Sequence, residues 1–255
     1  MKVVLAVTDA GKAFVKPLGG SDHGPHSLAC EWVGTCLATW FGLPTLDHAL
    51  MVLTDLDAEM IRDAGGQAQP GHAFVTRAVE QAHPWGGSGD ELKHVGNTDA
   101  IPGMVVFDTW SLNWDRCPPK GDARKLNYDN VLLARDDADR GRLRMLAIDH
   151  GECFAVGQEL GRQVASIDRM RDERIFGLFS VFEPYVKQPL VEQAAARLPH
   201  ATRAVADEIV GEIPNEWQVD KAARTSLVEL VSERAAYLAD NITVMLRDRI
   251  GKLFY

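Results

Sequence analysis

Two short apolar runs, separated by a charged segment, constrain the fold of this chain more than any other feature of its sequence. Residues 131–133 (Val-Leu-Leu) and 145–148 (Met-Leu-Ala-Ile) are each short enough to form a buried strand. The segment between them, residues 135–144, is charged and contains a glycine, as expected for a turn. The pattern predicts a two-stranded hairpin that carries Asn130 at one end and Asp149 at the other.

Polar residues beside these runs match the requirements of phosphoryl transfer. The reaction needs a carboxylate beside the attacking hydroxyl and oxygen ligands for the Mg²⁺ that accompanies the nucleotide phosphates. Protein kinases supply an Asp and an Asn from a catalytic loop, followed by a second Asp before a glycine. By this pattern Asp115, which follows a predicted helix over residues 101–113, would be the catalytic residue. Asn130 and Asp149 would be the metal ligands.

The order of these motifs resembles that of the HipA-like kinases and, more distantly, that of the phosphatidylinositol kinases. The shared marks are an Asp-Arg pair at residues 115–116, an Asn before an apolar strand at Asn130, and an Ile-Asp-His-Gly motif at residues 148–151. The resemblance extends, more weakly, from the N-terminus to about Phe154, and no motif matches beyond that residue. It implies ATP- and Mg²⁺-dependent transfer of a phosphoryl group to a hydroxyl of a protein or a small molecule.

The resemblance also implies a two-lobed α+β fold of the protein kinase type. A small β-rich N-lobe with one helix would span residues 1–79. A mainly helical C-lobe, with the catalytic loop, the metal-binding hairpin and a helical tail, would span residues 80–255. Residues 82–99, which are rich in glycine, are expected to form a loop. The sequence after Phe154 predicts helices over residues 168–182, 187–198, 201–211 and 220–250.

Lys16 and Glu31 form the predicted ion pair of the N-lobe. Two strands are expected over residues 2–7 and 13–18, and Lys16 lies on the second of them. Apolar residues at helical spacing predict a helix over residues 27–41, which carries Glu31. In kinases a strand lysine bridges the nucleotide phosphates and a helix glutamate. The resemblance therefore implies that Lys16, fixed by Glu31, takes part in catalysis and binds the nucleotide.

Other nucleotide contacts are expected from backbone groups. No GxGxxG motif is present, and the short turn at residues 9–11 is a poor substitute for it. Gly19 and Gly20 begin a glycine-rich segment before the predicted helix, where backbone N–H groups could cradle phosphate. A plain linker explains the same composition equally well. The adenine would bond to backbone groups between Thr76 and Val79.

The spacing of the catalytic motifs departs from the usual kinase pattern. Asp115 and Asn130 are 15 positions apart, against about five in the catalytic loop of protein kinases. Residues 117–129 are therefore interpreted as an insertion, and its Pro-Pro pair and its glycine predict a loop. The insertion contains Asn127, which is an alternative metal ligand. Asn130 is the preferred ligand because it directly precedes the apolar strand.

Composition argues against several other classes of protein. The net charge of −9 argues against a general nucleic-acid binder, and no polybasic patch is present for an anionic membrane. No apolar run reaches transmembrane length. The four cysteines form no Cys-x-x-Cys pair, and without a secretory signal they predict a cytoplasmic location. His23 and His26 lack a third ligand at a metal-site spacing and are expected to be exposed to solvent.

Two other functions remain open on the sequence alone. A nucleotide-binding pseudokinase that regulates a partner would keep the same residues, and the missing glycine-rich motif favours it. Transfer of AMP rather than the γ-phosphoryl group would use the same metal ligands with ATP inverted. The acidic composition favours a protein or a small soluble acceptor over a lipid.

Overall fold

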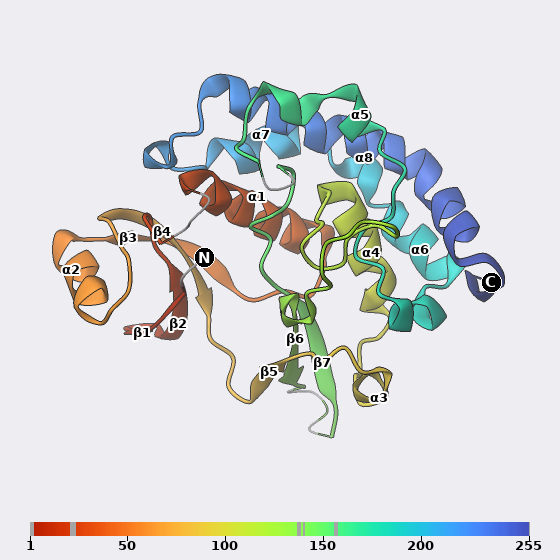
Figure 1. Cartoon of the computed structure of the whole chain (residues 1–255), viewed down its shortest axis with the longest axis horizontal. Coiled ribbons are helices and arrows are strands. Elements are labelled where there is room, and N and C mark those ends of the chain that lie inside the picture. The colour runs from red at the N-terminus through yellow and green to blue at the C-terminus, as the bar shows by residue number, and fades with distance from the viewer. Residues whose placement is uncertain (1–2, 21–23, 137–138, 140, 156–157, 255) are drawn as a thin grey trace.

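The structure is a computed structural model that describes residues 3–20, 24–136, 139, 141–155 and 158–254. A lobe built around a four-stranded sheet packs against a larger, mainly helical lobe that contains a three-stranded sheet (Figure 1). This is the two-lobed α+β arrangement that the sequence predicts. No helix among the described residues is both long and apolar enough to cross a membrane.

The four-stranded sheet of the N-lobe is antiparallel throughout, with the strand order β1-β2-β4-β3. In its register Lys16 pairs with Phe74, and residues directly opposite each other in such a pair share one face of the sheet. A capping box formed by Thr54 and Asp57 starts the helix α2 (Asp55–Asp63) after β3. The strands span Val4–Thr8 (β1), Gly11–Lys16 (β2), His48–Leu53 (β3) and Gly71–Arg77 (β4).

The hairpin predicted from the two apolar runs is present. It consists of β6 (Val131–Arg135) and β7 (Leu143–Ala147), which pair antiparallel. Asn130 and Asp149 lie at the same open end of the hairpin and not at opposite ends as predicted, because in an antiparallel pair the residue before the first strand is close to the residue after the second. The N–H of Ile148 donates to the carbonyl of Asn130 (3.1 Å) and closes that end.

A third strand, β5 (Ala82–Pro84), completes the sheet in the order β5-β6-β7. The loop predicted over residues 82–99 is therefore only partly correct, since this segment also contains the short helix α3 (Gly89–Leu92). The strand has three residues, lies at the sheet edge and ends at a proline, so it leaves almost no periodic pattern. The N–H of Trp85 extends the pairing by donating to the carbonyl of Val131 (2.8 Å).

The helical lobe is built on α4 and on helices from the last third of the chain. The indole N–H of Trp110 in α4 donates to the carbonyl of Val231 (2.9 Å), which ties α4 to the long α8. The helices α6, α7 and α8 confirm the predictions for their segments. The elements span Ala100–Ser111 (α4), Ile167–Met170 (α5), Gln188–Ala195 (α6), Arg203–Gly211 (α7) and Lys221–Ile250 (α8).

The helix predicted over residues 168–182 is wrong. Only the four residues of α5 and a 3₁₀ segment at Ser180–Tyr185 are regular there. Backbone donors in between bond to distant partners instead of to the carbonyl four residues earlier. The N–H of Phe176 donates to a threonine hydroxyl of α4 (3.1 Å), and the N–H of Gly177 donates to the carbonyl of Cys117 (2.8 Å). Tertiary contacts therefore override the local helical tendency of this segment.

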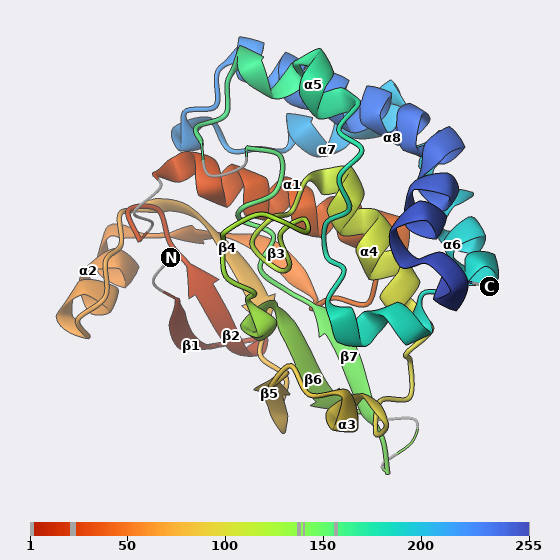
Figure 2. The same ribbon diagram turned by 45° about the vertical axis from the view of Figure 1, so that its right-hand side comes forward.

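Helix α1 (Pro25–Phe41) lies between the N-lobe sheet and the helical lobe in both views (Figures 1 and 2). Twelve of its 17 residues are buried, so it lacks the continuous polar face of a surface helix. It contacts β4 as well as α4 and α7. The helix is therefore held from both sides.

A direct bond between the lobes supplements this packing. The Glu216 carboxylate accepts from the backbone N–H of His72 in β4 (3.1 Å) and pairs with its ring. The indole N–H of Trp217 donates to the carbonyl of the same histidine (3.0 Å). The hydrogen bond from the His72 side chain lowers the pKa of Glu216 to about 2, so the carboxylate stays charged at neutral pH.

Candidate active site

Lys16, Glu31 and Asp149 form an ion cluster between the lobes. Lys16 is the last residue of β2, Glu31 lies in α1, and Asp149 follows β7. The Nζ atom of Lys16 lies 2.7 Å from Oε2 of Glu31 and 3.1 Å from Oδ1 of Asp149. Lys16 and Glu31 are buried, whereas the side chain of Asp149 is 45% exposed. The cluster therefore buries its cation and leaves one carboxylate accessible.

Opposing effects of burial and charge set the protonation of this cluster. Burial lowers the pKa of Lys16, but the two carboxylates outweigh it and leave the pKa above its usual value. Loss of solvent raises the pKa of Asp149, but the Lys16 ammonium and hydrogen bonds outweigh this effect and hold the pKa below its usual range. Burial raises the pKa of Glu31, and Lys16 only partly opposes the rise. Asp149 thus remains an anion that suits a hard cation.

The backbone at Asp149 and His150 is tied to α1. Asp149 has a left-handed φ of 57°, which is uncommon outside glycine and recurs at functional sites. The N–H of His150 donates to Oε1 of Glu31 (3.2 Å), and its Nδ1 lies 3.2 Å from Oγ1 of Thr35. Gly34 permits this approach, because a Cβ there would lie 2.6 Å from Cβ of His150. Burial holds the pKa of this imidazole well below its usual range, so the ring is neutral.

The loop after α4 brings Asp115 together with both candidate asparagines. Oδ2 of Asp115 accepts hydrogen bonds from the side-chain amides of Asn130 (2.8 Å) and Asn127 (3.2 Å). Asn130 is buried at the start of β6, whereas Asn127 is half-buried in the insertion. The insertion therefore folds back onto the predicted catalytic carboxylate rather than away from it.

Arg116 is a buried residue at this site, and its contacts were not predicted from the sequence. Its guanidinium donates to the carbonyls of Asn130 (3.1 Å) and Ile148 (3.0 Å). It also forms an ion pair with the fully buried Asp108 of α4, which accepts a further bond from Asn113 (3.1 Å). One side chain thus joins α4 to the open end of the hairpin. The only signal in the sequence is an arginine directly after the predicted catalytic residue.

A cavity of about 330 Å³ lies beside the ion cluster. Lys16, Glu31 and Asp149 line it together with Thr76 and Val79, the residues predicted to flank the adenine. A pocket with apolar walls and a charged end fits a ligand with a flat apolar ring and an anionic tail. The apolar walls include Phe14, Phe74, Leu132 and Ile148.

Gly19 and Gly20 lie in the turn that directly follows Lys16. The N–H of Gly20 donates to the carbonyl of Pro17 (3.2 Å) and closes this turn. Neither glycine is among the described residues that line the cavity. The turn between β1 and β2 lies at the opposite end of β2, roughly 16 Å from Lys16 at the usual rise per strand residue. Of the two turns, only the one that contains Gly19 and Gly20 is near the ion cluster.

His26 is not exposed, contrary to the prediction. It is half-buried in the first turn of α1, and its Nδ1 accepts from the N–H of Leu160 (3.1 Å). Its Nε2 lies 3.3 Å from the carbonyl of Gln218. The ring therefore links α1 to two segments of the helical lobe that are distant in sequence. His23, predicted to be exposed as well, lies outside the described residues.

The donor set at the open end of the hairpin fits a magnesium ion that arrives with a nucleotide. The described residues contain no group of three or more His, Cys, Asp or Glu side chains that could hold a metal by themselves. Asn130 and Asp149 offer the hard oxygen ligands that Mg²⁺ prefers. This ion usually keeps several waters and binds one or two carboxylates together with substrate phosphates. A complete protein cage is therefore not required.

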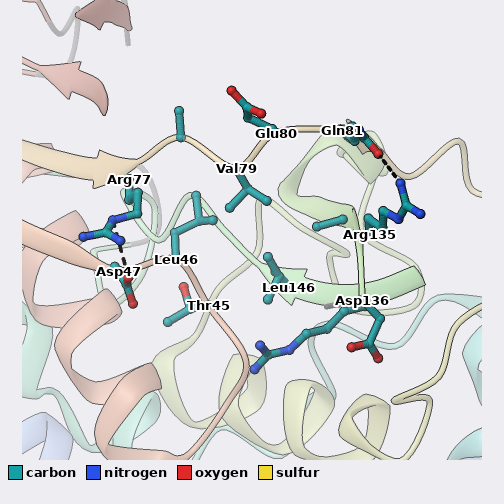
Figure 3. A pocket seen from close by; sticks show the side chains of 13 residues that line it. Thr45, Leu46, Asp47, Arg77, Val79, Glu80, Gln81, Arg135, Asp136 and Leu146 are labelled. Atoms are coloured by element: carbon teal, nitrogen blue, oxygen red, sulfur yellow. Dashed lines mark hydrogen bonds and ion pairs between the residues drawn. The ribbon is translucent and has the colours of Figure 1, made fainter. Parts of the chain in front are cut away.

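A larger cavity, of about 730 Å³, borders the segment that connects β4 to β5 (Figure 3). Its lining combines Arg77, Arg135 and Arg144 with three carboxylates, so its formal charges balance. Figure 3 shows Arg77 paired with Asp47 and Arg135 donating to the side chain of Gln81 (3.0 Å). The ion cluster lines the smaller cavity and not this one.

Comparison with known proteins identifies one family and one fold. A family model described as HipA-like kinase matches residues 6–242. No curated protein matches the sequence. A similar solved structure is that of a proinflammatory kinase, CtkA, from Helicobacter pylori, with a TM-score of 0.59 and 13% sequence identity. The match covers 97% of this chain and 94% of that chain, and at this identity it shows a shared fold.

The Arg116–Asp108 ion pair should be essential for stability. Replacing Arg116 with Met leaves the Asp108 carboxylate buried without its cation, which costs about 3–5 kcal/mol of unfolding free energy for such pairs. Urea unfolding followed by circular dichroism measures the loss. The control is Arg203→Met, which breaks an ion pair with Asp207 in which the side chains are 59% and 60% exposed, and it should cost less than about 1 kcal/mol. Equal losses in the two variants would contradict this assignment.

Proposed function

The chain belongs to the family of HipA-like kinases, and from this premise we propose that it transfers the γ-phosphoryl group of ATP, with Mg²⁺, to a hydroxyl of a protein or a small molecule. The observation that carries the proposal is the ion cluster of Lys16, Glu31 and Asp149 beside an apolar cavity. Asp115 and Asn130 are hydrogen-bonded to each other at the same site. This set supplies the positive charge, the metal ligands and the carboxylate that phosphoryl transfer requires.

Lys16 and the cavity would bind the nucleotide. The apolar walls would enclose the adenine, with backbone groups between Thr76 and Val79 as its hydrogen-bonding partners. Lys16 would neutralise phosphate charge, and Glu31 would not contact the nucleotide but would hold the ammonium in place. The turn with Gly19 and Gly20 directly follows Lys16 and would flank the phosphates.

Asn130 and Asp149 would hold the magnesium ion. Their oxygen atoms match its preference, and Asp149 carries the accessible charge of the ion cluster. When bound, the ion neutralises charge that develops on the phosphate oxygens. Asn127 remains the alternative ligand, because it contacts the same carboxylate of Asp115.

Asp115 would orient the acceptor hydroxyl and take up its proton. As the bond between the acceptor oxygen and the γ-phosphorus forms, the bond from that phosphorus to the oxygen of ADP breaks, and the proton passes to the Asp115 carboxylate. The amides of Asn127 and Asn130 fix the orientation of this carboxylate. Such positioning contributes strongly to catalysis, since a shift of about 1 Å can cost a hundredfold in rate.

The cysteines support a location in the cytoplasm. All four are free thiols, and Cys30, Cys117 and Cys153 are buried. A reducing compartment preserves such thiols. The proposed setting is therefore the cytoplasm, with a protein or a small soluble molecule as acceptor.

Replacing Asp115 with Ala should separate nucleotide binding from transfer. The carboxylate faces the acceptor in this proposal, so ATP with Mg²⁺ should still stabilise the variant, by about 2.7 kcal/mol at one hundred times its dissociation constant. Transfer of the γ-phosphoryl group should fall by about 10²–10⁴-fold, the range typical of a lost general base. Thermal unfolding and transfer of radiolabelled phosphate measure the two effects.

Three outcomes would contradict the proposed reaction. Wild-type protein that ATP stabilises, but that labels no acceptor, would be a pseudokinase. Label that reaches an acceptor from the α-phosphate would show AMP transfer. An absence of any stabilisation by ATP and Mg²⁺ would contradict nucleotide binding itself.

Separate substitutions of Asn130 and Asn127 should identify the metal ligand. Asn130 is buried at the strand start and its position is fixed through its carbonyl by Arg116, so it is the better-ordered donor. Asn130→Ala should raise the Mg²⁺ concentration for half-maximal turnover by about tenfold or more, as for other losses in metal sites. Asn127→Ala should change it by less than about threefold. The opposite ranking would move the ligand into the insertion.

A further inference from the structure

The insertion at residues 117–129 is anchored at both ends beside Asp115. The carbonyl of Cys117 accepts from the N–H of Gly177 (2.8 Å), and the N–H of Asn127 donates to the carbonyl of Arg116 (3.0 Å). The Asn127 side chain also donates to the Asp115 carboxylate. Its two ends are therefore fixed to the catalytic loop and to the neighbouring segment.

The part of the insertion between these anchors, residues 120–126, is here called the tip. Its Arg124 is held over the ring of Trp114, with 4.3 Å between the guanidinium carbon and the ring centroid. Asp122 pairs with the same guanidinium at 3.6 Å. Trp114 directly precedes Asp115, so this stacking fixes a cation next to the proposed catalytic residue.

Two further cations of the tip have no partner in the part of the chain that the structure describes. Lys120 and Lys125 are exposed, and neither forms an ion pair or hydrogen bond with another described residue. The tip carries three basic residues and one carboxylate, in a chain whose net charge is −9. Leu126 is also 46% exposed and adds an apolar contact surface.

The segment beside the tip does not cancel this charge. The hydrogen bond that Arg174 donates to Asp172 is the main cause of the raised pKa of Arg174, and Asp122 lies close enough to raise it further. Arg174 therefore adds one positive charge, and the carboxylate of Asp172, its ion-pair partner, balances it. The other acidic residue of the insertion, Asp129, lies outside the tip and is exposed. The tip, which Arg124 joins to the residue before Asp115, thus keeps an excess of positive charge.

We propose that the tip binds the acceptor, and that the acceptor is an acidic polypeptide segment with Asp or Glu residues around the reacting hydroxyl. The inference rests on the proposed function, since it takes Asp115 as the acceptor-facing residue. Arg124 offers planar donors that match carboxylates, and Lys120 and Lys125 offer mobile point charges. The patch is small and the chain is acidic, which disfavours an extended nucleic-acid backbone.

Peptide binding tests the proposal without a known acceptor. The probes are fluorescein-labelled short peptides with a central serine flanked by glutamates or by lysines, and a labelled single-stranded DNA of the same net charge as the acidic peptide. Fluorescence anisotropy at low salt measures their dissociation constants, with ATP and Mg²⁺ present. The acidic peptide should bind at least about tenfold more tightly than the basic one, which corresponds to roughly 1.4 kcal/mol.

A charge-reversed variant tests whether the tip is responsible for the preference for the acidic peptide. Lys120→Glu together with Lys125→Glu should abolish the tighter binding of the acidic peptide. The control is Lys221→Glu together with Lys252→Glu, which makes the same change in net charge at exposed lysines of α8 and the C-terminal 3₁₀ turn. The control should keep the preference. Both variants should keep the stabilisation by ATP, because neither change touches the ion cluster or the cavity.

The outcomes separate the acceptor proposal from the proposed function. Equal affinity for both peptides, or a preference that the tip variant retains, would overturn the acidic acceptor. DNA that binds as tightly as the acidic peptide and loses affinity in the tip variant would overturn it in favour of nucleic acid. Loss of stabilisation by ATP in the wild type would overturn the kinase proposal instead, whichever peptide binds.

Discussion

A buried lysine that requires two carboxylate partners is the interaction on which the rest of this structure depends. Taking the Lys16 ammonium out of water is costly, and only close opposite charges offset the cost. Glu31 comes from α1, and Asp149 comes from the end of the hairpin, 133 positions from Lys16. The N-lobe sheet, the interlobe helix and the hairpin must all be in place before this charge is compensated. The geometry of the site is therefore built into the packing of both lobes.

A second buried ion pair, between Arg116 and Asp108, ties separate elements of the C-lobe together in the same way. Arg116 compensates Asp108 and at the same time binds the carbonyls at the open end of the hairpin. Helix α1 links this ion pair to the ion cluster, because Glu31 bonds to Lys16 and to the backbone N–H of His150, whose Nε2 lies 3.5 Å from the Arg116 guanidinium. Since α1 is buried from both sides, movement of Glu31 away from Lys16 would expose apolar surface, and this favours the paired state.

Local patterns in the sequence predicted the hairpin, α1 and the C-terminal helices, because each has a clear period or boundary. The strand β5 was missed, since three residues carry no period, and the helix over residues 168–182 was wrong because its backbone donors bond to distant partners. The order of the motifs predicted that Lys16 and the segment with Asp115 belong to the site, but only the topology of the fold brings them close together. The Arg116–Asp108 pair and the approach of Asn127 depend on how the insertion folds, which spacing alone does not encode.

The most direct test of the central claim is a double-mutant cycle on Lys16 and Glu31. Calorimetry would measure the dissociation constant of ATP with Mg²⁺ for wild type, Lys16→Met, Glu31→Gln and the double variant. If Glu31 acts only by holding Lys16, its replacement should weaken binding in the wild type and change nothing once Lys16 is absent. The double variant should then match Lys16→Met, a non-additivity expected of residues in contact. Additive losses would show that the two residues act independently and would contradict the account.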